Sequence, residues 1–155
     1  MLEFALTSIP LVFVLFSVVW MGIGMWEYHT LTEAVNATAR SAAVHGAGCA
    51  GQTCATTVDT VARQLAAAAV GIPAGLLTVT LTSSASTVSC SPLNNCYGNS
   101  AAWPSLSGNV AGSTNISVAA TFQFASAISI WTPGHAGQSS TGVTLGANSM
   151  QAVVF

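Results

Sequence analysis

Hydrophobic and polar positions follow a helical period in the first part of this 155-residue chain and a strand period in the last part. Residues 1–45 predict one continuous helix, in which Pro10 should bend or loosen the preceding turn. Its first half, residues 4–26, is uncharged and apolar on all sides, and these 23 residues are enough to cross a bilayer. Further along, the apolar positions narrow to one stripe, made by Leu31, Val35, Ala39 and Ala42. This stripe predicts that one face of the helix packs against a small sheet.

The pattern after the long helix predicts an α+β head domain over residues 46–155. A short second helix is expected at residues 57–70, where Asp59 and Arg63 are spaced for an i, i+4 ion pair. Alternating apolar and polar residues then predict antiparallel strands in residues 76–82, 115–124 and 141–155. The fold class is therefore α+β, with one long helix, one short helix and a small antiparallel sheet.

Two irregular features interrupt this pattern. In the last strand the apolar phase shifts between Ala147 and Met150, which predicts a bulge or a sheet edge near Asn148. Residues 83–113 are rich in Ser, Asn, Gly and Pro, and we expect them to form one long loop.

Charge is unusually scarce. The six formal charges are Glu3, Glu27, Glu33, Arg40, Asp59 and Arg63. Two arginines cannot neutralise the phosphates that a nucleic-acid interface requires, so we expect no nucleic-acid partner. A surface with almost no charge also gives little protection against self-association. The alternatives are a neutral surface kept soluble by hydroxyl and amide groups, and a chain whose function is self-association.

The four cysteines form two local pairs, Cys49 with Cys54 and Cys90 with Cys96. Their spacings are longer than those of typical zinc knuckles, and an export-type N-terminus favours disulfides. Four cysteines allow three pairings, of which we favour the local one because each pair closes a short loop. We expect no metal site.

The sequence does not favour an enzyme. The three histidines are His29, His45 and His135, and no carboxylate follows Arg63 that could orient a catalytic base within the head. Asp59 is better explained by its ion pair with Arg63. Glycine-rich nucleotide-binding motifs are also missing from the sequence, so we expect neither catalytic activity nor a cofactor.

Two sequences, Asn36-Ala-Thr and Asn115-Ile-Ser, match the N-glycosylation sequon. Glycans would help to solubilise a head with so few charges. Asn36 and Asn115 are therefore candidate glycosylation sites.

The apolar half of the long helix has two physical alternatives. It can remain in a membrane as an anchor, or leave the bilayer and be buried among identical helices in a filament. Trp20, Trp26 and Tyr28 lie where the apolar run ends and are typical of a membrane-interface belt.

Glu3 stands at the head of this apolar run. In a helical stack its carboxylate can meet the amino-terminal ammonium of the next subunit. Such a pair adds little net stability but penalises wrong registers, because an unpaired buried charge costs several kcal/mol. The alternative is that Glu3 only complements the dipole at the helix N-terminus.

The stretches EFALTSIP (residues 3–10) and EYHTLTEAVNATARSAAVHG (residues 27–46) resemble the TadE-like proteins of tight-adherence (Tad) pilus systems, a branch of the type IV pilin superfamily. The resemblance is strong over residues 1–46 and looser through the cysteine pairs and the terminal TLGANSMQAVVF. It implies a pilin-type N-terminal helix, with Met1, Glu3, Phe4 and Pro10 in the segment that directs assembly. It also implies a precursor cut by a membrane peptidase that removes a short basic leader. No such leader precedes Met1, so we expect either the mature chain or one without its first residues.

Together these features predict the structural subunit of an extracellular, type IV pilus-like filament involved in adhesion. Its expected partners are identical subunits, the inner membrane before assembly, the prepilin peptidase and the Tad-type assembly machinery. The alternative is a minor pseudopilin or accessory protein that stays anchored in the inner membrane. A ligand-binding adhesin would need a concave polar site in residues 83–113.

Overall fold

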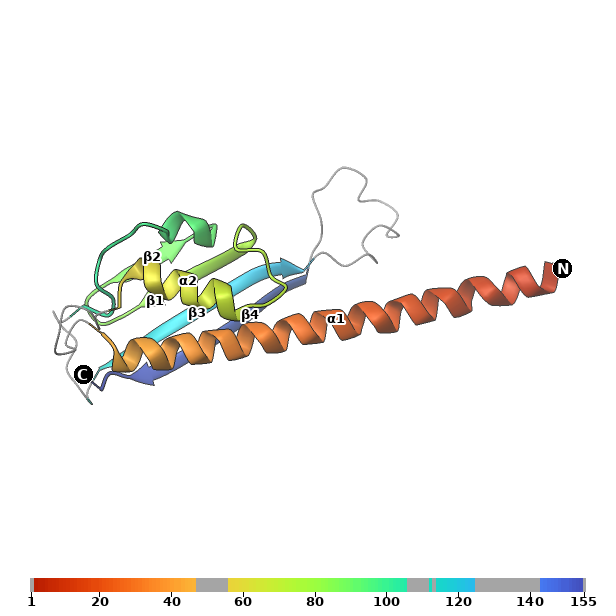
Figure 1. Ribbon diagram of the computed structural model, residues 1–155. Coiled ribbons are helices and arrows are strands. Elements are labelled where there is room, and N and C mark those ends of the chain that lie inside the picture. The colour runs from red at the N-terminus through yellow and green to blue at the C-terminus, as the bar shows by residue number, and fades with distance from the viewer. Residues whose placement is uncertain (1, 47–55, 106–111, 113, 125–142, 155) are drawn as a thin grey trace.

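The computed structural model describes residues 2–46, 56–105, 112, 114–124 and 143–154, without the side chains of residues 2–6. The fold is α+β, as predicted, with the helices on one side of a single sheet (Figure 1). The helices and strands are α1 (Leu2–Val44), α2 (Val58–Ala68), β1 (Leu77–Thr82), β2 (Thr87–Cys90), the 3-10 helix η1 (Leu93–Cys96), β3 (Asn115–Phe124) and β4 (Val143–Ala152).

The long helix α1 is continuous from Leu2 to Val44 and contains Pro10. Proline removes one backbone hydrogen bond, but this loss does not end the helix. Figure 1 shows α1 as one rod whose C-terminal half lies along the head and whose N-terminal half extends beyond it. The prediction of a continuous N-terminal helix is therefore confirmed.

The sheet has the strand order β2-β1-β3-β4, and every neighbouring pair is antiparallel. Alternation in β1 and β3 places one set of side chains against the helices and leaves threonine, serine and glutamine on the other face. The buried set is Leu77, Val79, Leu81, Ile116, Val118, Ala120 and Phe122. The strands predicted at residues 76–82 and 115–124 are thus confirmed, the first of them beginning at Leu77.

The hydrophobic core lies between this sheet face, α2 and the C-terminal half of α1. The predicted stripe of Leu31, Val35, Ala39 and Ala42 is buried, with at most 1% of any of these residues exposed. Ala34, Thr38 and Ala43 widen the stripe on the same side of the helix. Small residues at these positions let the helix axis come close to the sheet, and α1 lies mainly over β3 and β4.

Helix α2 begins with a reciprocal cap. The Thr57 side chain accepts a hydrogen bond from the backbone N–H of Thr60, and the Thr60 hydroxyl oxygen accepts one from the N–H of Thr57. These bonds satisfy two of the donors that a helix N-terminus leaves unpaired. Behind the cap, Val58, Val61 and Leu65 are buried, at the spacing of one helix face.

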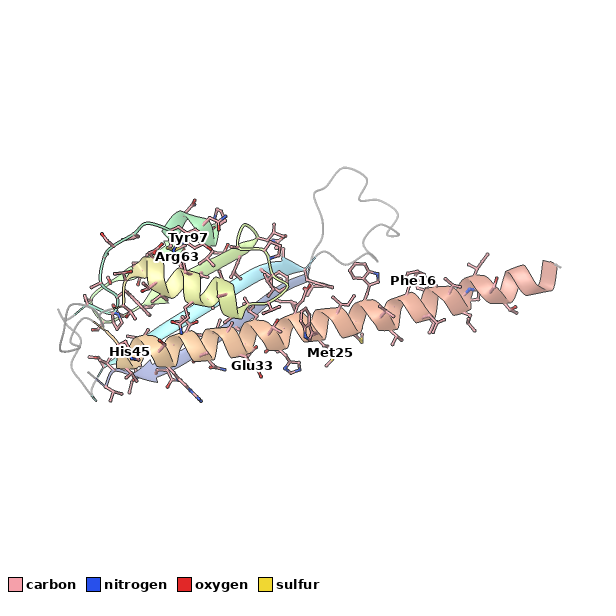
Figure 2. The ribbon with its side chains drawn as sticks, viewed as in Figure 1. Phe16, Met25, Glu33, His45, Arg63 and Tyr97 are labelled. Carbon is pink, nitrogen blue, oxygen red and sulfur yellow. A yellow bond between two sulfur atoms is a disulfide. The ribbon has the colours of Figure 1, made fainter. Side chains whose placement is uncertain are left out.

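The predicted ion pair on α2 is present, with 2.9 Å between Nε of Arg63 and Oδ1 of Asp59. Asp59 also accepts a hydrogen bond of 2.8 Å from the backbone N–H of Gly98, just after η1. The Arg63 guanidinium lies 4.8 Å from the ring centroid of Tyr97, so both charged side chains join α2 to the η1 segment (Figure 2). The Arg63 hydrogen bond, and then that from Gly98, lower the pKa of the Asp59 carboxyl below its usual value.

The prediction of one long loop over residues 83–113 is wrong in its first part. A tight turn, in which the N–H of Ser83 donates to the carbonyl of Ser86, brings β2 back against β1. The serine-rich composition hid this strand, because only Val88 interrupts its polar residues before Cys90. Cys90 and Cys96 form the predicted disulfide across η1. Cys49 and Cys54 lie outside the described residues.

The bulge predicted near Asn148 is wrong, and the alternative of a sheet edge is correct. The pairing of β4 with β3 runs without interruption from Val143 to Ala152, and β4 is an edge strand. Ser149 and Val153 keep the phase of the helix-facing side and are buried, whereas Met150 is 62% exposed. The apparent phase shift arose because a small polar residue, Ser149, fills a core position beneath α1.

Replacing Leu31 by alanine should destabilise the head by about 2–5 kcal/mol, because the side chain is fully buried and the change leaves a cavity. Leu15→Ala, on the same helix but 58% exposed, is the matched control and should leave the stability of the head unchanged. Urea unfolding in a nonionic detergent, followed by near-ultraviolet circular dichroism, measures both. If Leu31→Ala changed the stability of the head as little as Leu15→Ala does, the hydrophobic core would not include α1.

A second prediction concerns pH. Because the folded state lowers the pKa of Asp59, this carboxylate stabilises the fold above its unfolded pKa of about 3.9, and the contribution is lost as pH falls through the lower folded value. The wild type should therefore melt above the Asp59→Asn variant at neutral pH, and the difference should shrink in acid. A difference in melting temperature that is constant from neutral to acidic pH would contradict this role.

Candidate functional site

The most prominent surface of the molecule is the N-terminal half of α1. Its large apolar side chains are between 39% and 71% exposed, and they are Ile9, Leu11, Val12, Phe13, Val14, Leu15, Phe16, Val18, Val19, Met21, Ile23, Met25 and Trp26. We call these residues the apolar segment. In Figure 2, Phe16 lies on the part of α1 that extends beyond the head. The helix qualifies by length and hydropathy as a membrane span, and its most apolar window has no buried residue.

The exposure of this segment follows from its sequence. A helix that packs on a sheet needs one apolar stripe, as α1 has from Leu31 onward, whereas residues 7–26 are apolar on every side. Monomeric soluble proteins rarely expose contiguous apolar patches larger than a few hundred Å². The apolar segment therefore requires cover from lipid or from other protein chains.

The head meets the apolar segment at the end of β3. The rings of Phe124 and Trp20 pack edge to face, with centroids 6.1 Å apart. One turn along the helix, a Cβ atom added to Gly24 would lie 3.4 Å from Cε1 of Phe124, an ordinary van der Waals distance, so this ring packs directly on the helix. Phe124 therefore joins the distal end of the sheet to the helix.

A second contact joins the helix to the end of α2. Gly71 has a φ of +91°, and a Cβ atom added there would lie 2.8 Å from Cζ3 of Trp26. Only glycine combines this backbone conformation with so close an approach of an aromatic ring. The two contacts place the start of the head between Trp20 and Trp26, alongside the last two turns of the apolar segment.

Sequence reasoning did not bring these residues together. The sequence pattern predicts a membrane-interface belt for Trp20 and Trp26, and only a position in a strand for Phe124. The sequence signal for the second contact is Gly71, a glycine just after a helix, which leaves space for the Trp26 ring from a distant part of the chain. Trp26 and Tyr28 are about half exposed, so both can still reach a membrane interface. The membrane-interface belt therefore stays a prediction.

The first charge after the apolar segment is Glu27. It is partly buried, and among the described residues its Oε2 atom has no hydrogen-bond partner. Glu33 and Arg40 follow on the exposed side of α1. The boundary between the apolar segment and the charged part of the helix thus coincides with the start of the head.

The predicted assembly residues are only partly described. Met1 lies outside the described residues, and so do the side chains of Glu3 and Phe4, whose backbones belong to α1. Pro10 lies in the exposed part of α1. The role of Glu3 in register therefore stays a prediction.

The candidate glycosylation sites have different surroundings. Asn36 is half-buried on α1, and Thr38 of the same sequon is fully buried. Asn115 is exposed at the first position of β3. Within the folded head, Asn115 is therefore the more accessible of the two.

The histidines do not form a shared site in the described part of the chain. His29 packs its ring against Tyr28, with centroids 5.9 Å apart. Nδ1 of His45 lies 3.0 Å from the carbonyl oxygen of Ser41, within the last turn of α1. His135 lies outside the described residues. Where the structure describes side chains, no group of three or more His, Cys, Asp or Glu is arranged to hold a metal ion.

The chain was compared with known proteins. Neither the curated proteins nor the solved structures gave a match. One protein-family model matched the N-terminal part of the chain. Its range contains the apolar segment, the contacts of Trp20 and Trp26 with the head, and the buried stripe up to Ala39. Residues 1–40 match the family described as TadE-like protein, which confirms the resemblance predicted for this part of the sequence.

Proposed function

We propose that this chain is a structural subunit of an extracellular, type IV pilus-like filament, in which the apolar segments of many copies pack together as the core. The observation that carries this proposal is a long, unbroken helix whose N-terminal half is exposed and apolar on every side. The match of residues 1–40 to the TadE-like family supports an association with a Tad pilus system.

The geometry of α1 suits both residence in a membrane before assembly and packing in a filament afterwards. As a helix it satisfies its own backbone hydrogen bonds, so it can reside in lipid before assembly. In a filament the same surface would contact equivalent helices in place of lipid tails. Since both surroundings are apolar, close packing rather than the hydrophobic effect would favour the filament. Extraction from the inner membrane would therefore depend on prepilin peptidase and the Tad-type assembly machinery.

The head would form the outer layer of the filament. Its core encloses the C-terminal half of α1, and the contacts at Gly24 and Gly71 join it to the helix at two levels. The open face of the sheet carries hydroxyl and amide groups; for example, the Ser117 hydroxyl donates to Oδ1 of Asn148. A neutral, polar outer face of this kind supports adhesion by hydrogen bonding rather than by charge.

Electron microscopy of the purified native protein tests the proposal. We expect long fibres in negative stain without detergent, because the apolar segment needs partners once lipid is removed. A protein that remains a detergent-dependent monomer under all conditions would contradict filament formation. That result would favour the alternative function, a membrane-anchored minor pseudopilin or accessory protein.

Glu3 is the candidate for register within the filament. If its carboxylate pairs with the amino terminus of a neighbouring subunit, replacing it by alanine leaves a buried ammonium unpaired, at a cost of several kcal/mol. Glu3→Ala should therefore reduce fibre yield strongly or change the helical symmetry seen by cryo-electron microscopy. Glu33→Ala is the matched control, because Glu33 is an exposed carboxylate on the same helix. Unchanged fibres in Glu3→Ala would leave Glu3 with no role in register.

A further inference from the structure

The end of the head that faces the apolar segment is itself apolar. Phe124 pairs with Val143 across β3 and β4, and Leu77 pairs with Phe122 two residues earlier, so Leu76 and Val143 lie at the same end of the sheet. Val70 follows α2, next to the contact of Gly71 with Trp26. Val70, Leu76 and Val143 are between 59% and 61% exposed. We call these three residues the apolar end of the head.

This end of the head also carries no formal charge. Residues 69–76, 120–124 and 143–147 contain no Asp, Glu, Lys or Arg. The charged side chains of α2 are Asp59 in its first turn and Arg63 at its middle, so its last turn, which leads to Val70, carries no charge. Figure 1 shows the end of α2, the end of β3 and the start of β4 on the side of the head that faces the N-terminal half of α1.

The length of the helix brings lipid to this end. Counted from Phe4, after the charge of Glu3, to Val19, before the first contact with the head, the free apolar helix is about 24 Å long. The hydrocarbon core of a bilayer is about 30 Å thick. A helix that is too short draws its flanking residues toward the membrane or thins the bilayer locally. The flanking residues here include the apolar end of the head.

Exposed residues of α1 beside the head support the same conclusion. Met21, Ile23 and Met25 remain exposed beside the head, so the apolar helix surface continues past the point where Phe124 covers Trp20. Val143 lies at the same level along the helix, because its strand partner Phe124 packs on Trp20, and Leu76 lies at the same end of the sheet. Lipid that covers the exposed helix residues therefore also reaches Val143 and Leu76. Valine and leucine at this position make the contact favourable, whereas a charged end would oppose it.

We propose that, before assembly, the apolar end of the head is seated in the interface of the bilayer, with Val70, Leu76 and Val143 in contact with lipid. The partner is a lipid surface at the boundary between headgroups and acyl chains, recognised through apolar contact without charge. This inference rests on the proposed membrane stage of the function. It adds that the head lies on the membrane instead of standing clear of it on the helix.

Photocrosslinking of the full chain in phosphatidylcholine–phosphatidylglycerol vesicles tests the proposal. p-Benzoylphenylalanine is placed singly at Val143, Phe16 or Val154, and lipid adducts are counted by mass spectrometry. Phe16, in the apolar segment, reports whether the helix is in the membrane. Val154, 69% exposed and next to the other end of the same strand, is the matched control for an exposed valine.

We expect Val143 to give lipid adducts at a level close to that of Phe16 and roughly tenfold above that of Val154, the ratio that corresponds to the burial of one valine. Adducts at Phe16 but only the Val154 level at Val143 would overturn the seated head and leave the membrane stage intact. Adducts at neither position would overturn both. Adducts of Val143 with a second copy of the chain, in place of lipid, would assign this end to contacts between subunits.

Discussion

The structure depends on one constraint, the exclusion of water from the N-terminal half of α1. Complete removal from water stabilises each valine, leucine or phenylalanine of the apolar segment by about 1.5–3 kcal/mol, and in the described part of the chain the large side chains of this segment remain 39–71% exposed. The isolated monomer is therefore an incomplete unit. Its stable states are those in which lipid or other protein chains complete it, and the membrane and the filament that we propose would each meet this requirement.

The fold of the head does not depend on how the apolar segment is covered. Its core uses only the C-terminal half of α1, where Leu31 and Val35 pack on the sheet, and it also includes Leu93 and Cys96 of η1 and Trp103. The Cys90–Cys96 disulfide and the bonds of Asp59 to Arg63 and Gly98 hold the η1 segment.

Much of this could be predicted from periodicity. The change from all-round apolar to a single stripe at Leu31, the α2 face and the alternation in β1 and β3 each reflect local sequence, and the structure confirms them. The failures have physical causes that a local pattern does not contain. Strand β2 is short and polar and exists because it pairs with β1, and β4 keeps its register through Ser149, a small polar residue in a core position. The site itself was predicted as far as the apolar segment, but the contacts of Phe124 and Trp26 join residues about 45 to 105 positions apart.

The continuity of α1 has a mechanical consequence. Because no flexible linker separates the apolar segment from the head core, the two turn together as one body, and each residue along the helix corresponds to about 100° of rotation. In the proposed filament, the azimuth at which a subunit enters the core would therefore fix the direction in which its head points outward. Tension along a fibre would likewise pass through the backbone hydrogen bonds of a single helix into the β3–β4 layer, so the head would bear load rather than hang from it.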